Sequence, residues 1–258
     1  MTVRNTLERG RIVEAGRRLG VVLEAVSQKV APGVTTRELD QLAEQLIRAE
    51  GDVPAFKGYT PEGAPRPYPA ALCVSVNDEV VHGIPGDRKL VEGDIVSLDL
   101  GLVHEGLIVD SAVTVPVGKV SETSLKLMRA TEAALAAAIA AARPGGYVGD
   151  IAHATETAFS GTGFSVVKVL GGHGVGTAVH EEPYIPNAGR AGTGEKLVEG
   201  MVLALEPIAN EGKAGVVLAS DGYTYRAKDG SRSAHFEHTI LLEGDGAIIL
   251  TRRPSEVA

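Results

Sequence analysis

Four acidic side chains stand inside runs of the sequence that are otherwise apolar. Asp99 lies in IVSLDL, Asp110 in LIVDSAVTV, Glu206 in VLALEP and Glu237 in HFEHTILL. A charged side chain in a half-buried strand is unfavourable unless it is paired or binds a metal ion. Four carboxylates brought together would repel one another and resist ionisation unless cations lay among them. The pattern therefore predicts a metal centre built mainly from carboxylates.

The alternative is that these acids lie on the solvent side of edge strands, which is common for a single aspartate. In IVSLDL, alternation places Asp99 and Ser97 on the opposite face from Leu98. Few basic residues stand in the same runs to pair with the acids. Because all four acids occupy related positions of a repeated pattern, we expect one shared site.

Histidines add a second set of candidate residues. His82 and His180 occur in a repeated VHxxP pattern, and His173 lies seven residues before His180 in GGHGVGTAVHEEP. Glycines around His173 allow close backbone approach and unusual dihedrals, which favours a functional role over a purely structural one. His235 shares a strand face with Glu237 and could border the site. The other histidines are weaker candidates. His104 is expected in a loop, His153 on a helix surface, and His238 on the face opposite Glu237.

The mixture of ligands indicates the kind of metal and the chemistry. Several carboxylates with one or two imidazoles, and no cysteine cluster, suit oxygen-preferring divalent ions better than a structural zinc. Two such ions about 3.5–4 Å apart are held by bridging carboxylates and activate a water between them. The expected chemistry is therefore hydrolysis. The residues leave the identity of the metal open among Co, Mn, Fe and Zn.

The elements that must position these residues occur twice along the chain. KLVEG opens at Lys89 and again at Lys196, each time before a strand with an internal acid. In both halves a helix, a Pro-Gly turn, a second helix and a VHxxP motif precede it, with the turns at 32–33 and 144–145. These repeats in one order indicate an internal duplication over about 12–118 and 124–244. We expect a single domain spanning 1–258 with pseudo-twofold symmetry.

Periodicity and turn residues place the secondary structure. Helices are predicted at 5–30, 36–51, 121–143 and 149–163, the second capped by Thr35 or Thr36. Strands are predicted for ALCVSV, DIVSLDL, LIVDSAVTVPV, FSVVKVLG, MVLALEPIA and HFEHTILLEG, with a Pro- and Gly-rich loop at 59–69. The sequence thus predicts an α/β (α+β) fold of two helix–strand halves around a central site.

Size and composition set further limits. A chain of 258 residues can bury a substantial core, and 44% apolar and 22% charged residues are ordinary for a globular protein. The net charge of −8 argues against nucleic acid as the main partner. The single cysteine, Cys73, excludes an intrachain disulfide and fits a reducing compartment. With neither a secretory signal nor an apolar run of membrane-spanning length, we expect a cytoplasmic protein without a membrane partner.

The chain resembles a type I methionine aminopeptidase of the M24 metallopeptidases in NDEVVHGIP, DIVSLDLG, GGHGVGTAVHEEP, MVLALEPI and SAHFEHTI. The resemblance covers nearly the whole chain and implies the pita-bread fold, in which two αβ halves enclose a dinuclear metal site. It implies removal of the initiator methionine from nascent proteins and peptides with a small second residue, by attack of a metal-bridging hydroxide on the first peptide bond. Contact with the ribosome is left open, and a monomer is expected.

The resemblance also implies roles for the ligands. Asp99 would chelate one metal ion, while Asp110 and Glu237 would bridge it to a second. His173 and Glu206 would complete the second site, and Glu206 would shuttle the proton during attack. The free α-amine of the substrate would bind the metal ion held by Asp99, which restricts cutting to the first residue.

Two histidines and an apolar pocket are implied for the substrate. His180 would stabilise the tetrahedral oxyanion, and His82 would contact the amide region near the second residue. The chain departs from the family's pattern at Val179, where Phe is frequent, and at position 223, where Trp is frequent. Its 60–67 loop is longer than usual. The candidates for the methionine pocket are Phe56, Tyr59, Tyr68, Cys73 and Tyr223.

Two other functions remain as alternatives. A prolidase or aminopeptidase P shares the ligand pattern but usually carries an added N-terminal domain, which this chain is not expected to have. A non-catalytic pita-bread module that binds peptides typically loses metal ligands, whereas all five are present here. A zinc-binding N-terminal extension is not expected either. The segment between His180 and Glu206 is too short for the large insertion of type II enzymes.

Overall fold

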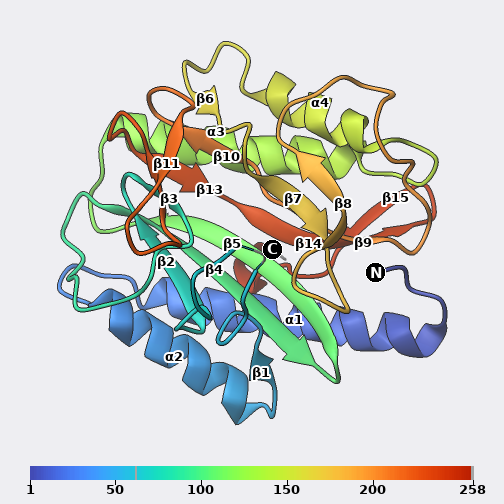
Figure 1. Ribbon diagram of the computed structural model, residues 1–258, viewed down its shortest axis with the longest axis horizontal. Coiled ribbons are helices and arrows are strands. Elements are labelled where there is room, and N and C mark those ends of the chain that lie inside the picture. The colour runs from blue at the N-terminus through green and yellow to red at the C-terminus, as the bar shows by residue number, and fades with distance from the viewer. Residues whose placement is uncertain (62, 257–258) are drawn as a thin grey trace.

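The computed structural model describes residues 1–61 and 63–256, and a curled antiparallel sheet forms its centre (Figure 1). The path through this sheet runs β1-β4-β5-β14-β9-β7-β8, with β2 paired to β4 and β15 to β14. Sheet order departs from chain order because β14, near the C-terminus, lies between β5 of the first half and β9 of the second. The strands are β1 (Val53–Pro54), β2 (Leu72–Val76), β4 (Ile95–His104), β5 (Leu107–Pro116), β7 (Gly171–Gly174), β8 (Glu181–Pro186), β9 (Val202–Leu205), β14 (Glu237–Glu243) and β15 (Gly246–Ile249).

Two small three-stranded sheets, β13-β10-β6 and β11-β12-β3, adjoin the central one. β10 follows β9 after a break at Glu206 and Pro207, and β13 precedes β14 with a break at Phe236. Proline has no N–H to donate to a strand ladder, which accounts for the first break. The strands are β3 (Glu79–Val81), β6 (Ser165–Val166), β10 (Ile208–Asn210), β11 (Val216–Leu218), β12 (Tyr225–Ala227) and β13 (Ser233–His235).

Two helices cover each half of the central sheet (Figure 1). The side chains of Asn5, Thr35 and Ser121 accept hydrogen bonds from first-turn N–H groups, so Thr35 is the N-cap of the second helix. No helix in the described part of the chain is both long and apolar enough to cross a bilayer. The helices are α1 (Thr6–Gln28), α2 (Thr36–Ala49), α3 (Glu122–Ala141), α4 (Val148–Ala158) and the 3₁₀ helix η1 (Pro254–Glu256).

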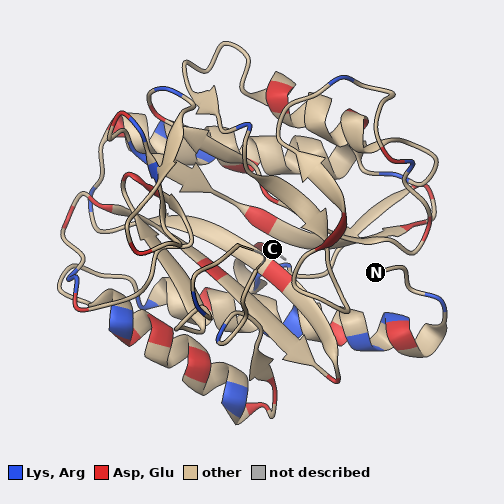
Figure 2. Cartoon of the chain, in the orientation of Figure 1, with Lys and Arg blue, Asp and Glu red and all other residues tan. Residues whose placement is uncertain are grey.

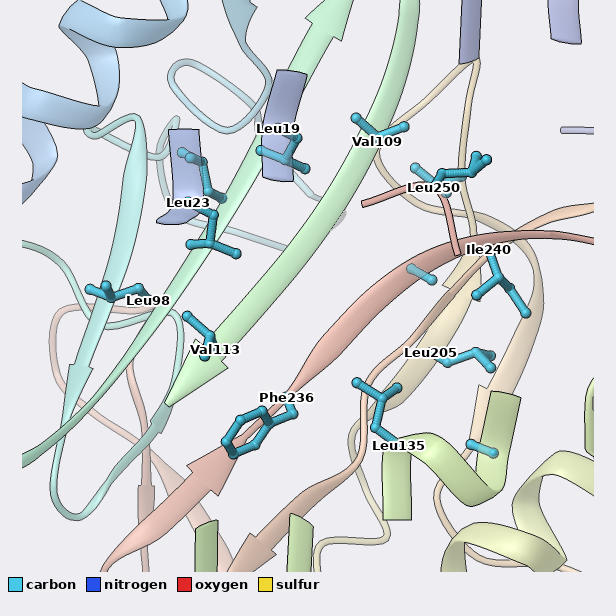
Figure 3. Packing of buried hydrophobic residues seen from close by; sticks show 14 of the residues in the cluster. Leu19, Leu23, Leu98, Val109, Val113, Leu135, Leu205, Phe236, Ile240 and Leu250 are labelled. Atoms are coloured by element: carbon cyan, nitrogen blue, oxygen red, sulfur yellow. The ribbon is translucent and has the colours of Figure 1, made fainter. Parts of the chain in front are cut away.

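Alternation along β4 and β5 gives the central sheet two chemically different faces. Leu98 of β4 and Val109 and Val113 of β5 pack with Leu19 and Leu23 of α1 in the main hydrophobic core (Figure 3). The residues between these positions emerge on the opposite face of the sheet. A hydrophobic core behind the strands therefore leaves their other face free to carry polar groups.

Besides the two strands broken at Pro207 and Phe236, three sequence predictions differ from the structure. FSVVKVLG forms the two-residue β6 and, at its final glycine, the start of β7, while Val169 between them is 70% exposed instead of lying in a strand. The fourth helix ends at Ala158, because the glycines at 161 and 163 that follow it adopt positive φ. His104 ends β4 rather than lying in a loop, and its Nδ1 is 2.8 Å from Oδ1 of the buried Asp52.

The two halves share a detailed contact pattern around their Pro-Gly turns. In each half the glycine of the turn donates its backbone N–H to the carbonyl oxygen of the leucine in KLVEG, at 2.8 Å. The residue before the following helix forms an isolated bridge with the lysine of the same motif. We propose that these contacts reflect the duplication expected from the sequence. The pairs are Gly33–Leu90, Gly145–Leu197, Thr35–Lys89 and Tyr147–Lys196.

The close approach of α1 to the C-terminal segment gives a test of this packing. A Cβ atom added at Gly16 would lie 2.5 Å from the carbonyl oxygen of Leu250, so Gly16→Ala must push the two segments apart. We expect the free energy of unfolding to fall by about 1–3 kcal/mol in chemical denaturation. Gly10→Ala on the same helix meets nothing within 4 Å and should instead stabilise by about 0.5–1 kcal/mol. Equal effects at the two positions would contradict the packing.

Candidate active site

The register of the central sheet brings three of the four predicted acids together. Asp99 of β4 and Glu237 of β14 both stand opposite Ala112 of β5, one on each side of it. Asp110 lies two residues before Ala112, so it emerges on the same face. Their exposures are 8%, 2% and 4%, respectively, which excludes the alternative of solvent-facing edge positions. Figure 2 accordingly shows acidic residues on the central strands.

The second half of the chain supplies a histidine and the fourth acid. His173 of β7 stands opposite Ala204 of β9, and Glu206 follows two residues after Ala204. The Nε2 atom of His173 is 3.7 Å from Oε1 of Glu206. Ligand atoms of His173, Asp110 and Glu237 lie within 4.8 Å of one another. Five residues that are far apart in the sequence therefore meet at one site.

His173 is held in one tautomer by its own strand. Its Nδ1 lies 2.8 Å from the carbonyl oxygen of Gly174, which can only accept a hydrogen bond. The ring hydrogen is thus on Nδ1, and Nε2 offers its lone pair toward the carboxylates. Burial lowers the pKa of His173 to about 3, which keeps the imidazole neutral. A neutral imidazole with a free Nε2 is the form that binds a metal ion.

The carboxylates lack the partners that buried charges normally require. Asp99 Oδ1, Asp110 Oδ1 and Glu237 Oε1 are buried with no hydrogen-bond partner among the described residues. Burial raises the pKa of Asp99 to about 7, and burial together with neighbouring carboxylates raises the pKa of Asp110, Glu206 and Glu237 well above the usual range. Unpaired buried oxygens that converge on one point are the ligands that divalent cations use. The residues present therefore fit a metal centre.

Hydroxyl side chains hold the two acid-bearing strands in register. The Thr239 hydroxyl accepts from the N–H of Asp110 at 2.9 Å and donates to the carbonyl of Asp110 at 2.7 Å. Ser111 donates its hydroxyl to the carbonyl of Glu237 at 2.7 Å. These bonds replace ladder bonds where β5 and β14 pair over only two residues. Sequence reasoning missed both residues, although a hydroxyl beside an acid in an apolar strand is the signal to look for.

The two histidines of the VHxxP motifs lie at the rim of the carboxylate cluster. The hydroxyl of Tyr59 is 3.0 Å from Nδ1 of His180, and the rings of His173 and His180 meet edge to face at 4.5 Å. His82 has φ of 59°, a left-handed conformation that is strained for a non-glycine residue. Burial, with a smaller contribution from His180, lowers the pKa of His82 to about 4. The structure thus places His82 and His180 beside the five candidate ligands.

Two cavities meet at this cluster. The first is lined partly by the carboxylates and partly by apolar and aromatic side chains. The second is a more open groove that includes Val169 and Tyr184. The residues common to both cavities are His82, His173, His180 and Glu206. The site can therefore hold one side chain in a pocket while a longer chain extends along the groove.

The apolar wall consists of the residues predicted for the pocket. Phe56, Tyr68, Cys73 and Tyr223 are buried in one hydrophobic cluster with Val179, and Tyr59 packs against that cluster. Cys73 stands directly opposite Asp99 in the β2–β4 pair, and burial raises the pKa of its thiol well above the usual range. The phenol of Tyr68 donates to the carbonyl of Gly83 at 2.9 Å, and that of Tyr223 donates to the carbonyl of Arg66. Hydrogen bonds thus fix two of the aromatic walls.

His235 lies closer to the carboxylates than sequence reasoning indicated. Its Nε2 is 3.7 Å from Oε2 of Glu206 and 3.7 Å from Oε2 of Glu237. The residue is 2% exposed, and Nε2 has no hydrogen-bond partner among the described residues. His238 points away from the cluster, with Nδ1 3.0 Å from Oγ1 of Thr251, and His153 is exposed on α4, both as expected.

Comparison with known proteins agrees with this geometry. Residues 10–243 match the model of metallopeptidase family M24. Methionine aminopeptidase 1 of Bacillus subtilis is 44% identical over 245 residues, covering 95% of this chain and 96% of that protein. The crystal structure of methionine aminopeptidase from Thermotoga maritima superposes with a TM-score of 0.92 at 43% identity, covering 98% and 100% of the two chains. These matches confirm the predicted α/β pita-bread fold.

A second kind of neighbour shares the fold alone. The prolidase from Pyrococcus furiosus gives a TM-score of 0.72 at 22% identity, and the match covers 97% of this chain but 65% of the prolidase.

The unpaired carboxylates give a prediction for the metal-free protein. Asp99 has a pKa of about 7 in the folded chain, against about 4 when unfolded, and the other three acids shift in the same direction. Folding therefore takes up protons, and stability that is present below pH 4 is lost as the pH rises through about 7. The lowered pKa values of the buried His82, His173, His180 and His235 act in the opposite direction, but only up to the unfolded value of about 6.5. The melting temperature of metal-free protein should therefore fall as the pH rises above about 6.5, and added Mn²⁺ should reverse the fall.

Removing one carboxyl group should reduce both the loss of stability at high pH and the gain of stability on adding Mn²⁺. We expect metal-free Asp110→Asn to exceed the wild type in stability at pH 8, because it removes a buried carboxyl group whose pKa is raised by burial and by the neighbouring Glu237 and Asp99. The variant should also gain less stability from Mn²⁺ and lose turnover, because an amide cannot bridge two cations. Asp245→Asn, in the exposed turn between β14 and β15, is the control and should change neither property.

Proposed function

The chain belongs to metallopeptidase family M24 and is a methionine aminopeptidase, and we propose that its substrates are peptides and nascent proteins whose second residue is small. The observation that carries this proposal is the apolar cavity that ends at the carboxylate cluster. An unbranched thioether side chain suits such a wall of aromatic rings and aliphatic groups. The region lined by His82 and His180, which both cavities share, would then receive the first peptide bond.

We propose that Asp99, Asp110, His173, Glu206 and Glu237 hold two divalent ions, as expected from the sequence. When bound, such ions polarise a carbonyl group and make a water molecule more acidic. The identity of the metal among Co, Mn, Fe and Zn, and the number of ions, stay predictions. A family that is named for its metal supports the use of divalent ions in general.

Glu206 is the residue that we propose moves the proton. It is 14% exposed at the side chain and lines both the pocket and the groove, so its carboxylate is accessible to a peptide bound across the two cavities. Burial and the negative charge of Asp99 and Asp110 raise its pKa, which favours proton uptake by its carboxylate. The same carboxyl group can then deliver the proton to the leaving nitrogen.

His180 is the proposed donor to the oxygen that becomes negative. Tyr59 can donate its hydroxyl hydrogen to Nδ1 of His180 at 3.0 Å, which leaves the ring hydrogen on Nε2. A fixed N–H directed into the site stabilises charge that develops on the scissile carbonyl oxygen. His82 lines both cavities as a neutral ring, and we propose that it contacts the amide near the second residue.

The alternatives have less support. The prolidase-like neighbours share the fold at 22% identity and are much longer than this chain, so they carry no argument for Xaa-Pro substrates. A non-catalytic peptide-binding module would not require five clustered ligands with unpaired oxygens. An encounter with nascent chains at the ribosome, a monomeric state and a cytoplasmic location stay predictions.

A direct assay tests the substrate proposal. Mn²⁺- or Co²⁺-loaded protein should release methionine from Met-Ala-Ser far faster than from Met-Lys-Ser, because the long second side chain would have to fit beside His82 and His180, which line both cavities. Ala-Pro should not be cleaved. Cleavage of Ala-Pro without methionine release from Met-Ala-Ser would reject the proposal in favour of a prolidase-like enzyme.

The hydrogen bond between Tyr59 and His180 gives a kinetic prediction. Tyr59→Phe removes the hydroxyl that sets the His180 tautomer, and we expect kcat for Met-Ala-Ser to fall roughly fivefold to tenfold with little change in KM, equivalent to about 1–1.5 kcal/mol. Tyr147→Phe, at the exposed start of α4, makes the same chemical change away from the site and should be silent. An unchanged kcat for Tyr59→Phe would remove Tyr59 from the mechanism.

A further inference from the structure

We propose that His235 is a positioning residue of the metal centre, which donates its Nε2 hydrogen to the carboxylates of Glu206 and Glu237. The inference rests on the proposed metal site and adds to it a residue outside the five expected ligands. Nε2 of His235 is equidistant from Oε2 of the two glutamates, at 3.7 Å from each. Its side chain is 3% exposed, so water does not replace these partners.

The position of the ring is set by three strands. His235 donates its backbone N–H to Oγ1 of Thr114 at 2.9 Å, and Thr114 donates its hydroxyl to the carbonyl of His235 at 2.8 Å. Because that hydroxyl hydrogen is already used, the 2.8 Å contact between Thr114 and Ser97 is donated by Ser97. His235 also pairs with Ile208 of β10, two residues after Glu206. The backbone therefore holds the imidazole against the carboxylates.

The neighbouring carboxylates of Glu206 and Glu237 determine whether Nε2 of His235 carries a hydrogen or a lone pair. Ionised carboxylates only accept hydrogen bonds, so a lone pair on Nε2 would face negative oxygen on both sides. A hydrogen on Nε2 turns both contacts into attractions. A hydrogen bond of normal length requires each 3.7 Å gap to shorten by about half an ångström, which a small rotation of a glutamate side chain supplies.

The contacts with His235 also give the two oxygens of each glutamate different surroundings. Glu206 directs Oε2 to His235 and Oε1 to Nε2 of His173. Glu237 directs Oε2 to His235 and leaves Oε1 buried without a partner. In both residues one oxygen faces His235 and the other is left for a cation. His235 thus acts on the cations through the orientation of two ligands that the chain supplies from different strands.

Metal binding to the full-length, metal-free protein tests the proposal without any peptide substrate. Isothermal titration with Mn²⁺ compares wild type with His235→Gln, whose amide keeps an N–H donor, and His235→Leu, which has similar size and no donor. We expect the leucine variant to bind Mn²⁺ about 10- to 100-fold more weakly, the usual effect of losing a residue that orients a ligand, and the glutamine variant to stay close to wild type.

His238→Gln is the matched control, because His238 is another buried histidine nearby but bonds to Thr251 on the other side of the strand. It should leave Mn²⁺ affinity unchanged even where it lowers the melting temperature. If His235→Leu does not fold, as judged by the melting curve of the metal-free protein, His235→Ala provides the same loss of the donor.

Two results would overturn the proposal. Equal losses of affinity in His235→Gln and His235→Leu, with an altered visible spectrum of the Co²⁺ protein, would make the imidazole itself a ligand. Wild-type affinity in every variant would leave His235 without a role at the metal. Failure of the proposed function is distinguishable, since it appears as absent methionine release while the wild-type titration and its dependence on His235 remain.

Discussion

Repulsion among buried carboxylates is the constraint on which the architecture depends. Asp99, Asp110, Glu206 and Glu237 lie together with little access to water, and no lysine or arginine of the described chain pairs with them. A fold that gathered such groups without cations would lose stability whenever they ionised. Protons, or the divalent ions that we propose the site holds, must therefore offset this negative charge at neutral pH. The neutral imidazoles around the cluster fit the same requirement, since they add donors and lone pairs without adding protein charge.

The scaffold meets this constraint by placing rigid packing behind the strands and polar bonds beside the acids. Leu98, Val109 and Val113 pack β4 and β5 against α1. This packing allows the opposite face of the sheet to carry carboxylates whose mutual repulsion disfavours folding. Hydroxyls of Thr239 and Ser111 hold β5 to β14 where backbone pairing is short. The breaks in the strands at Pro207 and Phe236 also help to position the acids Glu206 and Glu237. They let the chain pass from the large sheet to a small one beside a functional residue.

Local patterns in the sequence were sufficient for the chemistry but not for all of the geometry. Alternation in IVSLDL identified the face of Asp99, and the glycines around His173 marked a close approach, since both signals lie within a few residues. That Ala112 is the common neighbour of Asp99 and Glu237 could not be predicted, because it depends on pairing between distant strands. The position of His235 between two glutamates depends on the same long-range register. Short segments such as β6 were overpredicted because apolar composition alone does not create a partner strand.

The apolar wall of the first cavity has a consequence for the product of the reaction. Once a methionine has left, the new first residue of a proposed substrate is small and would contact little of the wall formed by Phe56, Tyr68 and Tyr223. A small side chain that fills little of the pocket contributes little binding energy, so removal of a second residue would be disfavoured. Mature proteins would thus be spared progressive trimming by the geometry of one pocket, without any separate stop signal in their sequences.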